Sequence, residues 1–135
     1  MPPTHADHAV VARLAIEDLV ARYCDAAARA DEAAFRACWT ADARWTGPGL
    51  DKSGRDAIVR AFATLRARVA LALQGVVSGT AHVEGTTATG TWWIEELQVT
   101  NDGKTREVVG RYDDDYVNGD GGWRIARRAF TPAGG

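Results

Sequence analysis

The stretch "GTWWIEELQVTNDGKTREVVGRYDDDY", residues 90–116, holds two apolar strands around one tight turn, and it decides the fold. A three-residue loop, Asn101-Asp102-Gly103, would place glycine at the position of a hairpin that needs a positive φ. Thr100 then lies opposite Lys104. This register predicts the following cross-strand pairs: Glu96 with Val108, Ile94 with Gly110, and Trp92 with Tyr112.

The same register answers which of two neighbouring glutamates faces the interior, because adjacent strand residues point to opposite faces. One face of the second strand is plainly solvated: Thr105, Glu107, Val109, Arg111, Asp113 and Asp115. The opposite face is therefore expected to point inward, and Glu96 with it: Val108, Gly110, Tyr112, Asp114 and Tyr116. Glu95 is expected outside, with Trp93, Leu97 and Val99. A two-residue Asp-Gly loop would reverse one strand against the other, but only the three-residue loop aligns both apolar faces.

The inner face is unusually polar for a core. Gly110 opposite Ile94 predicts an empty volume beside Glu96 that a ligand could fill. On the last strand, a loop over 118–121 would place Ile125 opposite Asp114 and Arg127 opposite Tyr112. The expected inner face then comprises Trp92, Glu96, Tyr112, Asp114, Tyr116 and Arg127. Two interpretations stay open: a site for chemistry, or a structural ion network of Glu96, Asp114 and Arg127.

Helices are expected in the first half of the chain. Residues 9–29 carry a buried helical stripe of Ile16, Leu19, Val20, Tyr23 and Ala27. Asp31 can cap a short helix at 32–39, and a strand is expected at 43–46. A third helix opens at "SGRD", where Ser53 and Asp56 have capping-box spacing. Its predicted buried stripe is Ile58, Phe62, Leu65, Val69 and Leu73.

Strands are expected in the second half, at 76–84, 86–100, 104–117 and 123–131, separated by good turn sequences. Helices followed by antiparallel strands indicate an α+β fold. We expect one domain over residues 1–135, with a core at about 9–131 and a curved sheet that leaves a pocket beneath it.

Composition narrows the function classes. The 135 residues have a formal net charge of −2, which leaves no basic surplus for a nucleic-acid partner. No apolar run approaches the ~20 residues of a membrane helix, and the charged N-terminal residues do not suit a signal peptide. We therefore expect a cytoplasmic protein without membrane contact. Cys24 and Cys38 are expected to be reduced thiols, and the histidines lack metal-ligand spacing, so no metal is predicted.

Several motifs resemble the SnoaL-like branch of the nuclear transport factor 2-like superfamily, over residues 12–131: "IEDL…RY", "DARW", "GRDAI" and "GRYDDDYV…GGWRI". The resemblance implies a cone of three helices on a strongly bent, mostly antiparallel sheet around a deep pocket. Relatives include scytalone dehydratase, polyketide cyclases, ketosteroid isomerase, bile-acid dehydratase and hexachlorocyclohexane dehydrochlorinase. The resemblance further implies proton-transfer chemistry without a cofactor. It also implies a homodimer through the outer sheet face at Trp93, Leu97 and Val99.

The resemblance also assigns individual residues. Tyr23 matches a pocket tyrosine of the dehydratases, and Trp45 a pocket tryptophan of the dehydrochlorinase. Glu96 falls where the bile-acid dehydratases carry an acidic pocket residue. The aspartate and histidine that pair in several relatives fall at Ala28 and Gln74, which argues against histidine-mediated dehydration or dehydrochlorination.

These observations predict a cofactor-independent lyase, isomerase or cyclase that acts on a small, fairly apolar carbonyl compound, aromatic or polyketide-like. Glu96 would transfer the proton, and Tyr23 and Tyr112 would donate hydrogen bonds. The predicted binding residues are Trp45 and Trp92 as walls, Gln74 to orient a carbonyl, Asp114 on the inner face and Arg127 as an anion anchor. Two alternatives stay open: a non-catalytic binding domain and a dimeric scaffold subunit.

Overall fold

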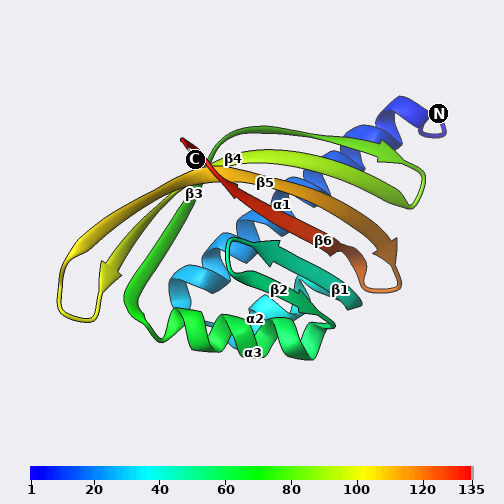
Figure 1. Cartoon of the computed structure of the whole chain (residues 1–135). Coiled ribbons are helices and arrows are strands. Elements are labelled where there is room, and N and C mark those ends of the chain that lie inside the picture. Colours follow the sequence, from blue (N-terminus) through cyan, green and yellow to red (C-terminus); the bar gives the residue numbers. More distant parts are fainter. Residues whose placement is uncertain (135) are drawn as a thin grey trace.

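A computed structural model describes residues 1–134 as three helices and one six-stranded, curved and unclosed sheet (Figure 1). This confirms the α+β prediction. The elements are α1 (His5–Arg29), α2 (Glu32–Ala37), β1 (Trp39–Gly47), β2 (Leu50–Ser53), α3 (Arg55–Arg66), β3 (Val69–Glu84), β4 (Thr87–Thr100), β5 (Thr105–Gly119) and β6 (Gly122–Pro132). No helix among residues 1–134 is both long and apolar enough to cross a membrane.

The sheet has the strand order β2-β1-β6-β5-β4-β3, in which only the β1–β6 pair is parallel. Figure 1 shows the long strands β3, β4 and β5 arching over α1, while α2 and α3 lie beside the short strands β1 and β2. The bend of the long strands separates the sheet from α3. The concave side of the sheet therefore has room for a site.

Helix α1 begins at His5, earlier than the predicted residue 9, because a capping box holds its first turn. The Asp7 amide donates to the Thr4 hydroxyl at 3.2 Å, and the Thr4 amide donates back to the Asp7 carboxylate at 3.0 Å. The predicted buried stripe of α1 is confirmed, since its five members are at most 5% exposed: Ile16, Leu19, Val20, Tyr23 and Ala27.

Helix α3 differs from the prediction at both ends. Its N-cap is Gly54, which makes no side-chain capping bond, so the Ser53–Asp56 capping box is wrong; Asp56 instead forms an ion pair with Arg36 at 2.7 Å. The helix ends at Arg66, and the apolar residues predicted to continue its stripe, Val69 and Leu73, belong to β3. Pairing of this segment with β4 overrides the helical spacing of its apolar residues.

The central hairpin has the predicted register. Glu96 lies opposite Val108, Ile94 opposite Gly110, and Trp92 opposite Tyr112. Gly103 has φ 87°, and the Thr100 amide donates to the Lys104 carbonyl at 2.7 Å, as the three-residue loop requires. Consequently Glu95 is exposed and Glu96 is partly buried on the concave face.

The last hairpin corrects the prediction for Arg127. Gly119 pairs with Gly122, so the turn has two residues and not the predicted four. The pairing then shifts by one extra residue in β6: Ile125 lies opposite Tyr116, but Arg127, two residues further along β6, lies opposite Asp115, the next residue of β5. The predicted pairs of Ile125 with Asp114 and of Arg127 with Tyr112 are therefore wrong. Arg127 points outward to Asp115 at 2.8 Å, and Arg128 takes the inward position.

Candidate active site

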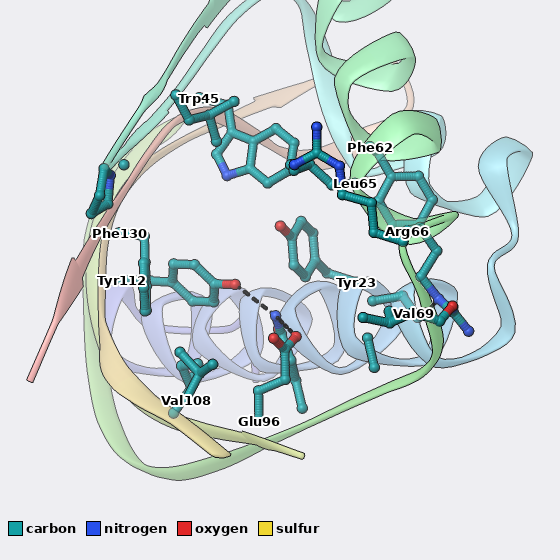
Figure 2. A pocket seen from close by; sticks show the side chains of 18 of the residues that line it. Tyr23, Trp45, Phe62, Leu65, Arg66, Val69, Glu96, Val108, Tyr112 and Phe130 are labelled. Carbon is teal, nitrogen blue, oxygen red and sulfur yellow. Dashed lines mark hydrogen bonds between the residues drawn. The ribbon is translucent and has the colours of Figure 1, made fainter. Parts of the chain in front are cut away.

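A cavity of about 350 Å³ opens between the concave face of the sheet, α1 and α3 (Figure 2). Its walls are mostly apolar and aromatic: Tyr23, Trp45, Leu50, Phe62, Leu65, Ile94, Val108, Tyr112 and Phe130. Its ionisable side chains, apart from the two tyrosines, are Glu96, Arg66 and Arg68. Such a cavity, apolar with few convergent polar groups, is typical of small-molecule sites.

Glu96 is fixed in the cavity by two side-chain amides. Gln74, its cross-strand partner on β3, donates from Nε2 to Oε1 of Glu96 at 2.8 Å. Gln98 donates to the other carboxylate oxygen, and its own carbonyl oxygen accepts from Arg106, which fixes the orientation of the Gln98 amide. Both oxygens of Glu96 thus act as acceptors of side-chain amide protons, which fixes the orientation of the carboxyl group.

The same glutamine links Glu96 to Tyr112. Nε2 of Gln74 also donates to the Tyr112 hydroxyl oxygen at 2.9 Å, and the Cys24 thiol donates to Oε1 of Gln74 at 3.8 Å. Since both amide protons of Gln74 are used, the Tyr112 oxygen is an acceptor here and its own proton is left for a ligand. Figure 2 shows Tyr112 and Glu96 pointing toward each other, with Tyr23 projecting into the same space.

Burial raises the pKa of both phenols, so they stay protonated further into the alkaline range than an exposed tyrosine. Burial raises the pKa of Tyr112 to about 12, and burial together with the neighbouring Tyr112 raises the pKa of Tyr23 well above its usual value. Desolvation disfavours the charged phenolate in each case. The two hydroxyls are therefore available as hydrogen-bond donors.

A buried ion pair supports the two tyrosines from behind. Arg128 and Asp114 are both buried. Nε and Nη2 of Arg128 donate to Oδ1 and Oδ2 of Asp114 at 2.8 and 2.7 Å, respectively. The guanidinium carbon of Arg128 lies 3.8 Å from the ring centroid of Tyr112 and 4.3 Å from that of Tyr23. Tyr116 donates to Asp114, and the Trp92 indole donates to Tyr116 at 2.7 Å. This network holds the rings in place, and the ion-paired guanidinium lies against the faces of both.

The structure brings together five of the eight predicted site residues. Those that line the cavity are Tyr23, Trp45, Gln74, Glu96 and Tyr112. Trp92 and Asp114 face inward as predicted, but they are buried in the network behind the cavity and do not line it. Arg127 lies on the opposite face of the sheet, so its predicted inward position is wrong. The predicted gap over Gly110 is also wrong, because the Phe130 ring fills it: a Cβ on Gly110 would lie 2.4 Å from that ring.

Sequence reasoning missed three residues of this site. Gln98 has the same strand parity as Glu96, two residues away, and that parity was signal enough to find it. Arg128 was hidden by the bulge in β6, which no local sequence signal marks. Arg66 lies in the predicted third helix. Its side-chain donors bond to carbonyls of α1 and β3, which only the tertiary structure brings near it.

The structure offers no metal centre within residues 1–134, where no group of three or more His, Cys, Asp or Glu side chains is placed to hold an ion. Cys24 and Cys38 are both free thiols. Burial raises the pKa of Cys38 to about 11, which is typical of an inert core thiol.

Comparison with known families agrees with this architecture. The sequence profile of the SnoaL-like domain matches residues 8–129, nearly the whole chain. The chain belongs to the SnoaL-like family. No curated protein sequence gives a significant match to this family member.

Solved structures similar to this SnoaL-like protein share its fold. A protein of Novosphingobium aromaticivorans, provisionally named an aromatic ring hydroxylase, has 26% identity and a TM-score of 0.86, over 92% of this chain and 90% of its own. A Mycobacterium tuberculosis protein of unknown function has 28% identity and a TM-score of 0.80, over 88% and 70%. A hexachlorocyclohexane dehydrochlorinase of Novosphingobium barchaimii has 19% identity and a TM-score of 0.79, over 93% and 92%, and shows the fold alone. A nuclear transport factor 2-like superfamily protein of Salmonella enterica, at 18% identity and a TM-score of 0.86 over 91% of this chain and 92% of its own, also shows the same fold.

Proposed function

We propose that this SnoaL-like protein is a cofactor-independent lyase, isomerase or cyclase that moves a proton on a small, fairly apolar carbonyl compound. One observation carries the proposal: Glu96 stands in an apolar cavity with both oxygens held as acceptors by Gln74 and Gln98, beside the Tyr112 hydroxyl. An oriented carboxylate next to oriented donors is the arrangement that acid–base catalysis requires.

In the proposed mechanism Glu96 takes the proton from the carbon next to the substrate carbonyl. The C–H bond breaks, an O–H bond forms on Glu96, and the electron pair moves onto the carbonyl oxygen as an enolate. Tyr112 and Tyr23 donate hydrogen bonds to that oxygen, and Arg128 behind their rings favours the negative charge. Glu96 then returns the proton to a carbon of the enolate. In the lyase case the enolate instead expels a group from the β-carbon, and that group takes the proton from Glu96. In the cyclase case the enolate carbon attacks a second carbonyl carbon of the substrate, whose C=O π bond breaks and whose oxygen takes the proton.

Gln74 acts in this mechanism as a positioning residue. It sits where several relatives carry a histidine, and its amide orients both Glu96 and Tyr112 without exchanging a proton. The proposal therefore assigns proton transfer to Glu96 alone and does not need the aspartate–histidine pair that falls at Ala28 and Gln74.

A second candidate function is non-catalytic binding of the same class of molecule, or a dimeric scaffold role. The absence of the aspartate–histidine pair favours binding over catalysis. The exposed apolar side chains of the outer sheet face favour a homodimer in either case: Trp93, Leu97 and Val109 are 41%, 38% and 47% exposed.

Proton exchange separates catalysis from binding. The α-protons of α-tetralone, a compact ring ketone, are followed by proton NMR in heavy water with and without the protein. We expect exchange well above the buffer rate, saturating with ketone concentration. Saturable binding of α-tetralone by calorimetry with exchange at the buffer rate would assign the protein to the binding class and overturn the enzyme proposal.

A further inference from the structure

The mouth of the cavity is positively charged. Arg66 and Arg68 line it where α3 meets β3, and Arg68 is exposed there together with Pro48 and Gly49 of the β1–β2 turn. Across residues 1–134 no carboxylate lies within ion-pair distance of either arginine. The only carboxylate that lines the cavity, Glu96, is already bound by two glutamines. The two arginines outnumber the single carboxylate of the cavity, so its lining has a net positive formal charge.

The two arginines differ in what they can offer. The donors of Arg66 are used on backbone carbonyls: those of Ala27 at 2.7 Å, Val69 at 2.8 Å and Ala28 at 3.1 Å. Arg66 therefore contributes charge from a fixed position, which Figure 2 shows beside Val69 and across the cavity from Tyr112 and Phe130. Arg68 makes no side-chain hydrogen bond in the described structure, so its planar set of donors is open to an anion at the rim.

The adjacent turn does not neutralise this charge. Asn101 donates to the Ala67 carbonyl at 3.1 Å, which brings the β4–β5 turn beside the mouth. Its acidic residue, Asp102, is engaged by the Thr100 hydroxyl and lies 3.8 Å from the Lys104 ammonium. A ligand with a carboxylate would therefore meet attraction at the rim and apolar walls inside.

We infer that the substrate of this site bears a carboxylate, which Arg68 binds at the cavity mouth while the carbonyl end lies between Glu96 and Tyr112. The inference rests on the proposed function for the inner end of the site. It adds the substrate class: a ring compound with a ketone at one end and a carboxylate at the other. Arg66 attracts the same carboxylate from its fixed position without sharing its donors.

The test compares two ligands that differ only in charge, β-benzoylpropionate and its amide, by calorimetry at low ionic strength. The wild-type protein should bind the carboxylate up to about fivefold more tightly than the amide, the upper range for an exposed charge pair. Arg68→Gln should lose most of the preference, with a small remainder from the fixed charge of Arg66, while Arg68→Lys should keep a larger part of it. Added salt should narrow the difference. Arg60→Gln, an exposed arginine of α3 away from the cavity, is the control for net charge and should behave as the wild type.

Equal affinity of the wild type for the two ligands would overturn the inference, and so would a preference of wild-type size in Arg68→Gln. The outcome is separate from that of the proposed function. The exchange experiment uses the uncharged α-tetralone, so catalysis there can fail while the carboxylate preference holds, and the preference can fail while exchange by Glu96 holds.

Discussion

The Tyr112 hydroxyl affects both the stability of the folded protein at alkaline pH and the proposed proton-transfer reaction. Its pKa is about 12 in the folded protein against 10.0 ordinarily, so between these pH values the folded state keeps a proton that the unfolded state loses. The contribution to stability is complete below about pH 10 and is lost as pH rises toward 12. We expect Tyr112→Phe to flatten the alkaline fall in the free energy of unfolding, measured by urea denaturation across this range. The same variant should slow α-proton exchange about 100-fold, the effect of losing one donor to an oxyanion.

An unchanged alkaline stability profile in Tyr112→Phe would contradict the burial assigned to this phenol. Exchange at the wild-type rate would remove Tyr112 from the set of donors.

A second residue-scale test concerns the contact between Gly110 and Phe130. A Cβ on Gly110 would lie 2.4 Å from the Phe130 ring and 2.6 Å from the Thr131 carbonyl, which is backbone and cannot rotate away. We expect Gly110→Ala to lower the free energy of unfolding by about 1–3 kcal/mol, the cost of overpacking. Phe130 lines the cavity, so ligand affinity should fall as well. The matched control is Gly75→Ala on β3, whose added Cβ would meet nothing within 4 Å. Equal stability of the two variants would contradict the contact.

At the scale of elements, β5 and β6 are joined by the buried pair of Asp114 and Arg128. Removing one partner leaves the other charged and buried, so Asp114→Asn and Arg128→Met should each cost about 3–5 kcal/mol of folding free energy, measured by chemical denaturation. The double variant Asp114→Asn with Arg128→Met should be less destabilised than the sum of these two single variants, because no unpaired charge remains. Additive losses would show that the two side chains act independently.

The hairpins explain how much of the site could be predicted from sequence. The β4–β5 register follows from local chemistry, since Gly103 with its positive φ fixes the turn, and this alone places Glu96 inside and Glu95 outside. The β5–β6 register depends on one extra residue in β6, whose position is set by packing of Ile125 and Arg128 in the core. Strand alternation counted across that bulge therefore selected Arg127 and missed Arg128.

The same distinction holds for the helices. The buried stripe of α1 was predictable because its apolar spacing and its tertiary environment agree. The end of α3 was not, because Val69 and Leu73 continue a helical spacing while the backbone from Val69 onward pairs with β4. Local pattern predicts an element well where no long-range pairing competes for the same residues.

At the scale of the whole molecule, the outer sheet face predicts a homodimer. Leu73 and Leu97 are cross-strand partners there, Trp93 lies under the Arg111 guanidinium at 5.4 Å, and Val99 continues the stripe. We expect light scattering at micromolar concentration to give twice the chain mass of 14.5 kDa. Trp93→Glu should shift the protein toward monomer without changing ligand affinity, because this face lies on the far side of the sheet from the cavity. A wild-type monomer would contradict this assignment.

Proton transfer by Glu96 inside the cavity underlies every step of the proposed function. Glu95 is the natural control, since it is the adjacent residue with the same side chain on the opposite face of the same strand. The most direct measurement is the rate of α-proton exchange of α-tetralone in heavy water for Glu96→Gln and Glu95→Gln, with both variants verified as folded. The exchange rate with Glu96→Gln should fall to the buffer rate, while the exchange rate with Glu95→Gln should equal that of the wild type. Wild-type exchange in Glu96→Gln, or its loss in Glu95→Gln, would contradict this role of Glu96.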